Sequence, residues 1–127
     1  MSITTPGLRA YEVSVRSDVA DLVVKLRELL GAKLVAYIGS VNETRAVRQW
    51  ADGDRVPSGD VIRRLRLAYH VAGMLAERDQ PRVIQAWFQG MNPLLDDSAP
   101  ARILREGADD DSGRQVLAAA RAFAAVG

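Results

Sequence analysis

The stretch that decides the fold is residues 33–57, KLVAYIGSVNETRAVRQWADGDRVP. It predicts a helix-turn-helix, with a short first helix over about residues 33–38 and a turn at residues 39–40. The polar residues 42–44 can begin the second helix, because short polar side chains cap the free backbone amides of a first helical turn. Gly53 can end it, since glycine takes the left-handed position after a helix at little cost.

The second helix of this motif separates into two faces when it is wound at roughly 100° per residue. One face is apolar and can pack on a core; it carries Ala46, Val47 and Trp50. The other face bears guanidinium and amide groups, which suit the base edges and phosphates of a DNA major groove. An ordinary solvated helix face is the alternative interpretation. We predict DNA contacts from Thr44, Arg45, Arg48, Gln49 and Arg55.

The size and composition predict a small globular protein. With 127 residues, 48% of them hydrophobic and 26% charged, the chain suits one domain or two very small ones that share a core. It contains no apolar run long enough to span a membrane, and its N-terminal segment lacks the apolar core of a secretory signal. The absence of cysteine excludes disulfides and thiolate metal sites, so we expect a cytoplasmic location and no membrane partner.

The charge is small overall but unevenly distributed. The formal net charge is +1 at pH 7, yet basic side chains outnumber acidic ones over residues 33–69 and acidic ones predominate over residues 92–127. A basic middle and an acidic tail indicate two surfaces with different partners.

The pattern of apolar residues predicts an all-α protein in three parts. Residues 1–16 form a flexible arm, in which an alternating pattern over residues 11–15 leaves a short strand as the alternative. Residues 17–77 form a helix-turn-helix domain that ends in a long helix beginning at Ser58. Residues 78–127 form a small domain of shorter helices.

Several polar residues have both a functional and a structural interpretation. Residues 109–111 are three aspartates that either bind a cation or, as we favour, cap the last helix. Arg63 and Arg64 either solubilise the long helix or approach phosphates beside the groove. His70 is the only histidine, and no catalytic triad, phosphate-binding loop or metal cluster accompanies it. We therefore expect no enzyme, no cofactor and no metal.

The order of several motifs resembles that of one known family. VRQWADGDRVP occupies residues 47–57, and RRLRLAYHVAGML follows at residues 63–75. An Ala-Trp pair then precedes N-x-L-L at residues 92–95 and P-x-x-I-L-x-x-G at residues 100–107. In this order, from about residue 17 to the end, the chain resembles the Xre/MbcA/ParS-like antitoxins.

The resemblance implies the role of a type II antitoxin. Members of this family pair with a RES-domain toxin that consumes NAD, or with a related NAD-consuming toxin; their C-terminal region covers the active-site cleft, and their helix-turn-helix often represses their own operon. It also implies a homodimer or a hetero-oligomer with the toxin, and operator DNA as a second partner. The residues that match the toxin-binding region are Trp87, Asn92, Leu94, Leu95, Pro100, Ile103, Leu104 and Arg105.

Two features depart from the family pattern. The N-terminal arm is not shared, and Asp52 lies at the end of the DNA-facing helix. A stand-alone helix-turn-helix regulator whose C-terminal half only dimerises is the alternative function. A pure inhibitor that has lost DNA binding is a third. Of the adjacent Trp87 and Phe88, we expect one to be a core residue and the other to be available to a partner.

Overall fold

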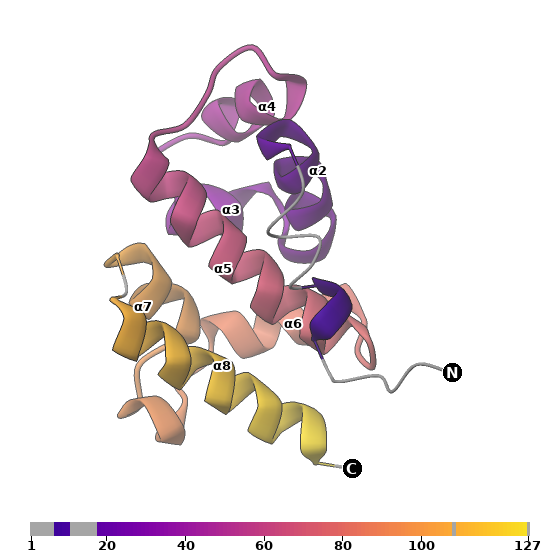
Figure 1. Cartoon of the computed structure of the whole chain (residues 1–127), viewed down its shortest axis with the longest axis vertical. Coiled ribbons are helices and arrows are strands. Elements are labelled where there is room, and N and C mark those ends of the chain that lie inside the picture. Colours follow the sequence, from indigo (N-terminus) through magenta and orange to yellow (C-terminus); the bar gives the residue numbers. More distant parts are fainter. Residues whose placement is uncertain (1–6, 11–17, 108, 127) are drawn as a thin grey trace.

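The structure is a computed structural model that describes residues 7–10, 18–107 and 109–126. The protein is all-α, as the sequence predicts, and no strand occurs in the described residues. In chain order, the elements are α2 (Val19–Leu30), α3 (Ala32–Ile38), α4 (Thr44–Asp52), α5 (Gly59–Ala76), α6 (Pro81–Gln89), the short 3-10 helix η1 (Pro93–Leu95), α7 (Pro100–Arg105) and α8 (Asp110–Ala125) (Figure 1).

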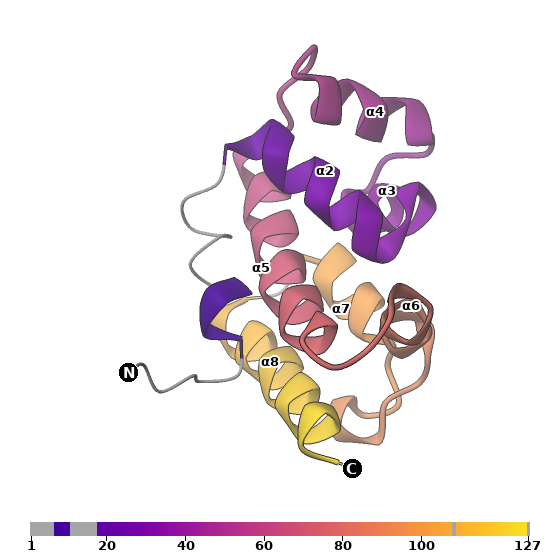
Figure 2. The same cartoon turned by 90° about the vertical axis from the view of Figure 1, so that its right-hand side faces the viewer.

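The long helix α5 joins the two ends of the molecule. Helix α4 lies at one end and α8 at the other, while α5 runs between them (Figures 1 and 2). It contacts α2 and α3 from the N-terminal half, and α6, α7 and α8 from the C-terminal half. One apolar core takes in residues from both halves, so it continues across the boundary expected between residues 77 and 78. The two ends are therefore held by a shared core.

Helix α2 forms because its apolar side chains repeat at helical spacing. Four of these side chains, Leu22, Val23, Leu26 and Leu30, are buried. Gly31 ends the helix at φ 82°, a left-handed conformation that glycine adopts without strain. Asp18 precedes the first turn and makes no side-chain capping bond.

The turn between α3 and α4 depends on close packing at Gly39. A Cβ atom at this position would lie 2.9 Å from Cη2 of Trp50, and the Trp50 side chain is fixed in the core with 2% of its surface exposed. Helix α4 begins at Thr44, within the predicted residues 42–44, but Glu43 before it makes no side-chain capping bond, so the start is confirmed and the predicted side-chain cap is wrong. Gly53 does end α4, at φ 79°.

Part of the expected N-terminal arm packs against α5. The backbone N–H of Gly7 donates to Oε2 of Glu77 at 3.0 Å. Ala10 is buried and lies directly against Gly73, where a Cβ atom would collide with it. The strand considered over residues 11–15, like residues 1–6, lies outside the described residues.

Candidate functional site

The exposed face of α4 carries the arginines predicted to contact DNA. Ala46, Val47 and Trp50 are buried, which confirms the predicted apolar face. On the opposite side, Arg45 and Arg48 are exposed. Together with exposed Thr44 and half-buried Gln49, they form a polar face at one end of the molecule (Figure 1).

The charges on this face are available to a ligand. Among the described residues, Arg45, Arg48 and the exposed Arg55 take part in no ion pair. Arg55 lies just beyond the end of α4, where its backbone N–H donates to the Gln49 carbonyl at 3.3 Å. Asp52 is exposed near the same helix end, so the positive charge is concentrated toward the start of α4.

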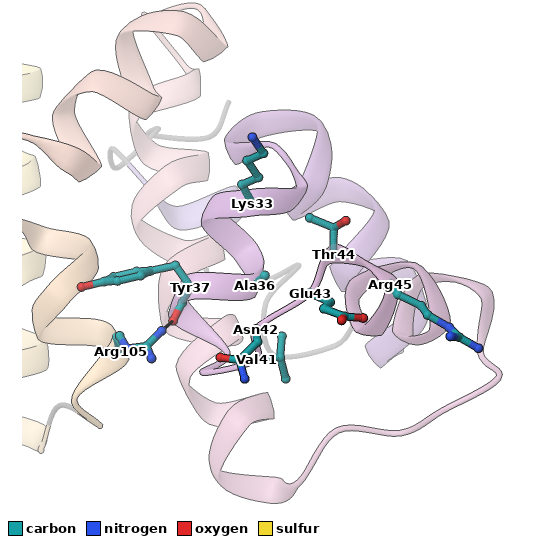
Figure 3. A pocket seen from close by; sticks show the side chains of 9 residues that line it. All are labelled: Lys33, Ala36, Tyr37, Val41, Asn42, Glu43, Thr44, Arg45 and Arg105. Carbon is teal, nitrogen blue, oxygen red and sulfur yellow. Dashed lines mark hydrogen bonds between the residues drawn. The ribbon is translucent and has the colours of Figure 1, made fainter.

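Two hollows adjoin the start of α4. The larger, of about 680 Å³, is lined by Lys33 and Tyr37 from α3, Thr44 and Arg45 from α4, and Arg105 from α7 (Figure 3). The other, of about 520 Å³, shares Asn42, Glu43 and Arg45 with it and extends past Gln49 to Arg55. The surface around the start of the predicted DNA-binding helix is therefore recessed from Arg55 to Arg105.

Arg64 holds the helix-turn-helix against the C-terminal half. Its Nη1 donates to the carbonyl of Ile38 at 3.0 Å, to Oγ of Ser40 at 2.9 Å and to the carbonyl of Arg105 at 3.0 Å. The other edge of the guanidinium, through Nε, donates to Asp60 at 3.0 Å. With 12% of its side chain exposed, Arg64 is a structural residue, so its suggested approach to phosphates is wrong.

The carboxylate of Asp60 orients this guanidinium. Asp60 lies in the first turn of α5 and bonds both Arg64 and Arg63. The hydrogen bond from Arg64, followed by the one from Arg63, lowers the pKa of Asp60 below its ordinary value. Asp60 therefore remains ionised as Arg64 bridges the three acceptors.

The predicted toxin-binding segment contains several residues whose side chains hold the fold together. Leu95 is 4% exposed, Leu104 is fully buried and Pro100 is buried, so these three side chains offer a partner little surface. Oδ1 of Asn92 accepts the backbone N–H of Leu94 at 2.9 Å and begins η1. The spacing of these residues in the segment is explained by folding of the turn and of α7.

Other residues of the same region do present apolar surface. Leu94 is 64% exposed and Met91 is 81% exposed. Phe88 is fully buried while Trp87 is half-buried, as expected for adjacent residues on a helix. The Trp87 ring lies 6.3 Å from that of Phe123, which is itself exposed on α8. We call Trp87, Met91, Leu94 and Phe123 the C-terminal apolar surface; Ile103 is half-buried beside the core.

Arg105 lies apart from that surface. Its Nη1 donates to the Tyr37 carbonyl at 2.7 Å, and its guanidinium carbon is 4.6 Å from the centre of the Tyr37 ring. Such stacking is a favourable cation–π contact. The two residues are 68 positions apart, so no sequence spacing indicates their contact. Lys33 and Tyr37 line the hollow beside the start of α4, and the sequence did not single them out.

Of the three aspartates, Asp109 caps α8, and Asp110 and Asp111 lie in its first turn. Oδ1 of Asp109 accepts the backbone N–H of Ser112 at 2.7 Å, which confirms the favoured interpretation. Hydrogen bonding to Ser112 lowers the pKa of Asp109 below its ordinary value. No group of three or more potential metal ligands occurs in residues 7–10, 18–107 and 109–126. Across the same ranges, no helix has the length and apolar character needed to cross a membrane.

Comparisons with protein-family models, with curated proteins and with solved structures find no match to this chain. A functional assignment therefore depends on the chemistry of the exposed faces: an arginine-bearing helix at one end of the molecule and an apolar surface at the other.

Proposed function

We propose that this protein is a type II antitoxin that binds operator DNA through α4 and occludes a NAD-degrading, RES-type toxin through its C-terminal half. The observation that carries the proposal is the presence of two chemically different exposed surfaces on one continuous core. The resemblance to the Xre/MbcA/ParS-like antitoxins assigns DNA to the first surface and a toxin to the second.

The geometry of α4 supports the DNA-binding part of this function. Its buried side holds the helix firmly on α2 and α3, while Arg45 and Arg48 extend from the opposite side. A helix presented in this way can enter a major groove, where each well-formed bidentate arginine contact discriminates by about 1–3 kcal/mol. Autorepression of the operon would follow from binding at its promoter.

The C-terminal apolar surface supports the toxin-binding part. Large apolar side chains exposed on a protein are candidates for an interface, and tryptophan is a frequent energetic anchor. Leu94, Trp87 and Ile103 are the apolar side chains of the expected toxin-binding set that retain exposed surface. Inhibition would be steric, since a stable complex buries roughly 1,600 Å² in total and can close the route by which NAD enters.

A stand-alone regulator is the second candidate, and the same apolar surface favours it. Two copies of the chain could cover each other's C-terminal apolar surface and form a dimer suited to a two-fold operator. Both candidates need DNA binding, so the occupant of the C-terminal apolar surface decides between them.

Leu94→Asp is the informative substitution, because Leu94 is exposed while neighbouring Leu95 is buried. The variant is co-expressed with the protein encoded next to this one, and growth and intracellular NAD are measured. We expect loss of neutralisation and of the co-purifying complex, with an unchanged melting temperature. Val56→Asp is the matched control: it introduces the same charge at an exposed aliphatic residue far from that surface, and it should preserve neutralisation.

The outcomes separate the candidates. A neighbouring protein that is harmless alone and never binds the wild-type chain would refute the antitoxin function. If Leu94→Asp instead converts a dimer into a monomer and no toxin is bound, the regulator is correct. A double variant, Arg45→Ala with Arg48→Ala, tests DNA binding separately; unchanged affinity at one stated salt concentration would remove DNA from the proposal and leave a pure inhibitor.

A further inference from the structure

The hollow beside α4 gathers cations from elements that are distant in the sequence. Lys33 comes from α3, Arg45 from α4 and Arg105 from α7, and all three line the same space of about 680 Å³ (Figure 3). Glu43 lines it as well, so the side chains around the hollow carry a net positive charge. The C-terminal half therefore contributes a positive charge to the face that presents the predicted DNA-binding helix.

The recessed face continues from α4 to α7. A smaller hollow, of about 270 Å³, shares Lys33 and Tyr37 with the first and is also lined by Arg102 of α7. Arg102 is exposed and bonds Glu106 at 2.8 Å, so its charge is partly balanced. The line of hollows thus passes from Arg55, past the start of α4 and across α3, to α7.

The Arg105 guanidinium is held in a fixed position at the edge of the larger hollow. Its bond to the Tyr37 carbonyl and its stacking on the Tyr37 ring limit the conformations of a long side chain. The carbonyl of Arg105 accepts from Arg64, which also bonds Ile38 and Ser40 of the helix-turn-helix. A cation that is already positioned loses little side-chain entropy when it binds an anion.

We propose that the larger hollow, through Lys33 and Arg105, binds the phosphate backbone of the DNA duplex whose major groove receives α4. The proposal rests on the DNA-binding part of the proposed function. A helix in a groove about 12 Å wide is flanked by both phosphate strands. The recess with Arg55 and the recess with Lys33 and Arg105 adjoin at the start of α4, where they share Asn42, Glu43 and Arg45. A cationic recess beside the start of α4 can therefore meet a phosphate strand.

This inference gives Arg105 a different partner from the one implied by the family resemblance. Arg105 lies against Tyr37 on α3 and lines the same hollow as the start of α4 (Figure 3). Leu94, in contrast, lies on η1, which packs against α8. The matched antitoxin motif thus contributes Leu94 to the C-terminal apolar surface and Arg105 to the hollow beside α4.

The salt dependence of DNA binding tests the proposal. Fluorescence anisotropy measures the affinity for two duplexes of about 30 base pairs, roughly three helical turns, one of arbitrary sequence and one from upstream of the protein's own coding sequence. Salt is varied between about 50 and 200 mM. The variants are Lys33→Ala, which removes an exposed charge, and Arg105→Gln, which removes the charge and keeps a polar side chain. Arg121→Ala on α8 is the control, since it removes the same charge from an exposed position at the opposite end of the molecule.

We expect Lys33→Ala and Arg105→Gln each to reduce the slope of log K against log salt by about 0.9, the contribution of one phosphate contact, on both duplexes. Arg121→Ala should retain the wild-type slope, and circular dichroism with thermal melting should show that each variant is folded. This inference would be overturned if Lys33→Ala and Arg105→Gln both kept the wild-type slope while the double variant Arg45→Ala with Arg48→Ala abolished binding. That result would leave the proposal that α4 binds DNA unchanged. Failure of the wild type to bind either duplex at the lowest salt would overturn both.

Discussion

The hydrogen bonds of Arg64 predict a large loss of stability when its guanidinium is removed. Arg64→Met keeps the aliphatic stem and the helix propensity of α5. It deprives the carbonyls of Ile38 and Arg105 of a charged donor. A net contribution of roughly 1.5 kcal/mol for each of these two part-buried bonds gives about 3 kcal/mol. For a chain of 127 residues, this corresponds to a fall in Tm of roughly 12 °C.

Arg63→Met is a matched control for this prediction. Arg63 is one residue away on the same helix and bonds the same Asp60, yet 56% of its side chain is exposed. Urea unfolding followed by circular dichroism measures both variants against the wild type, and Arg63→Met should behave nearly as the wild type does. Equal changes in the free energy of unfolding for the two variants would refute the inference that Arg64 fastens the helix-turn-helix to α7.

Two further predictions concern the turn and the dependence of stability on pH. Gly39→Ala should destabilise the fold by about 1–3 kcal/mol, because the added methyl group meets the fixed Trp50 ring; an unchanged urea midpoint would show that the ring yields. Burial, and then the charge of Arg121, lowers the pKa of His70 below its ordinary value of 6.5. The unfolded chain therefore binds this proton more readily, so the stability due to neutral His70 is present above pH 6.5 and is lost as the pH falls below it through the folded-state pKa. His70→Gln should therefore lose less Tm than the wild type between about pH 7 and pH 5. Parallel curves of Tm against pH for the two proteins would contradict the role given to His70.

Arg64 also bears on how the two surfaces communicate. It bonds the last turn of α3, the Ser40 turn and the end of α7, so the segment proposed to bind DNA and the motif proposed to bind a toxin meet at one side chain. The C-terminal half is therefore packed directly against the N-terminal half. It forms part of the support on which α4 is presented, which is consistent with a core shared across the expected boundary.

Much of the helical framework follows from local chemistry that can be recognised in the sequence. The stripe of α2, the two faces of α4 and the glycine that ends α4 depend on residue spacing and on the conformational freedom of glycine. The cap of α8 by Asp109 depends on a side chain that bonds an amide three residues away. These interactions join residues within one or two helical turns, so periodicity and residue type are sufficient to predict them. The absent capping bond before α4 is an exception, because Gly53 and the packing of Trp50 already define that helix.

The assignment of residues to surfaces required the tertiary structure. The sequence does not distinguish which residues of one motif contact a partner; the motif includes Leu94, Leu95, Leu104 and Arg105. Packing separates them: Leu94 is exposed, Leu95 and Leu104 join the core, and Arg105 stacks on Tyr37. Residue spacing determines which side chains share the face of one helix, and it predicted the arginine face of α4. Which faces of different helices meet depends on how the helices dock, and that docking decided which side chains of the C-terminal half are buried, which are exposed and which lie against α3.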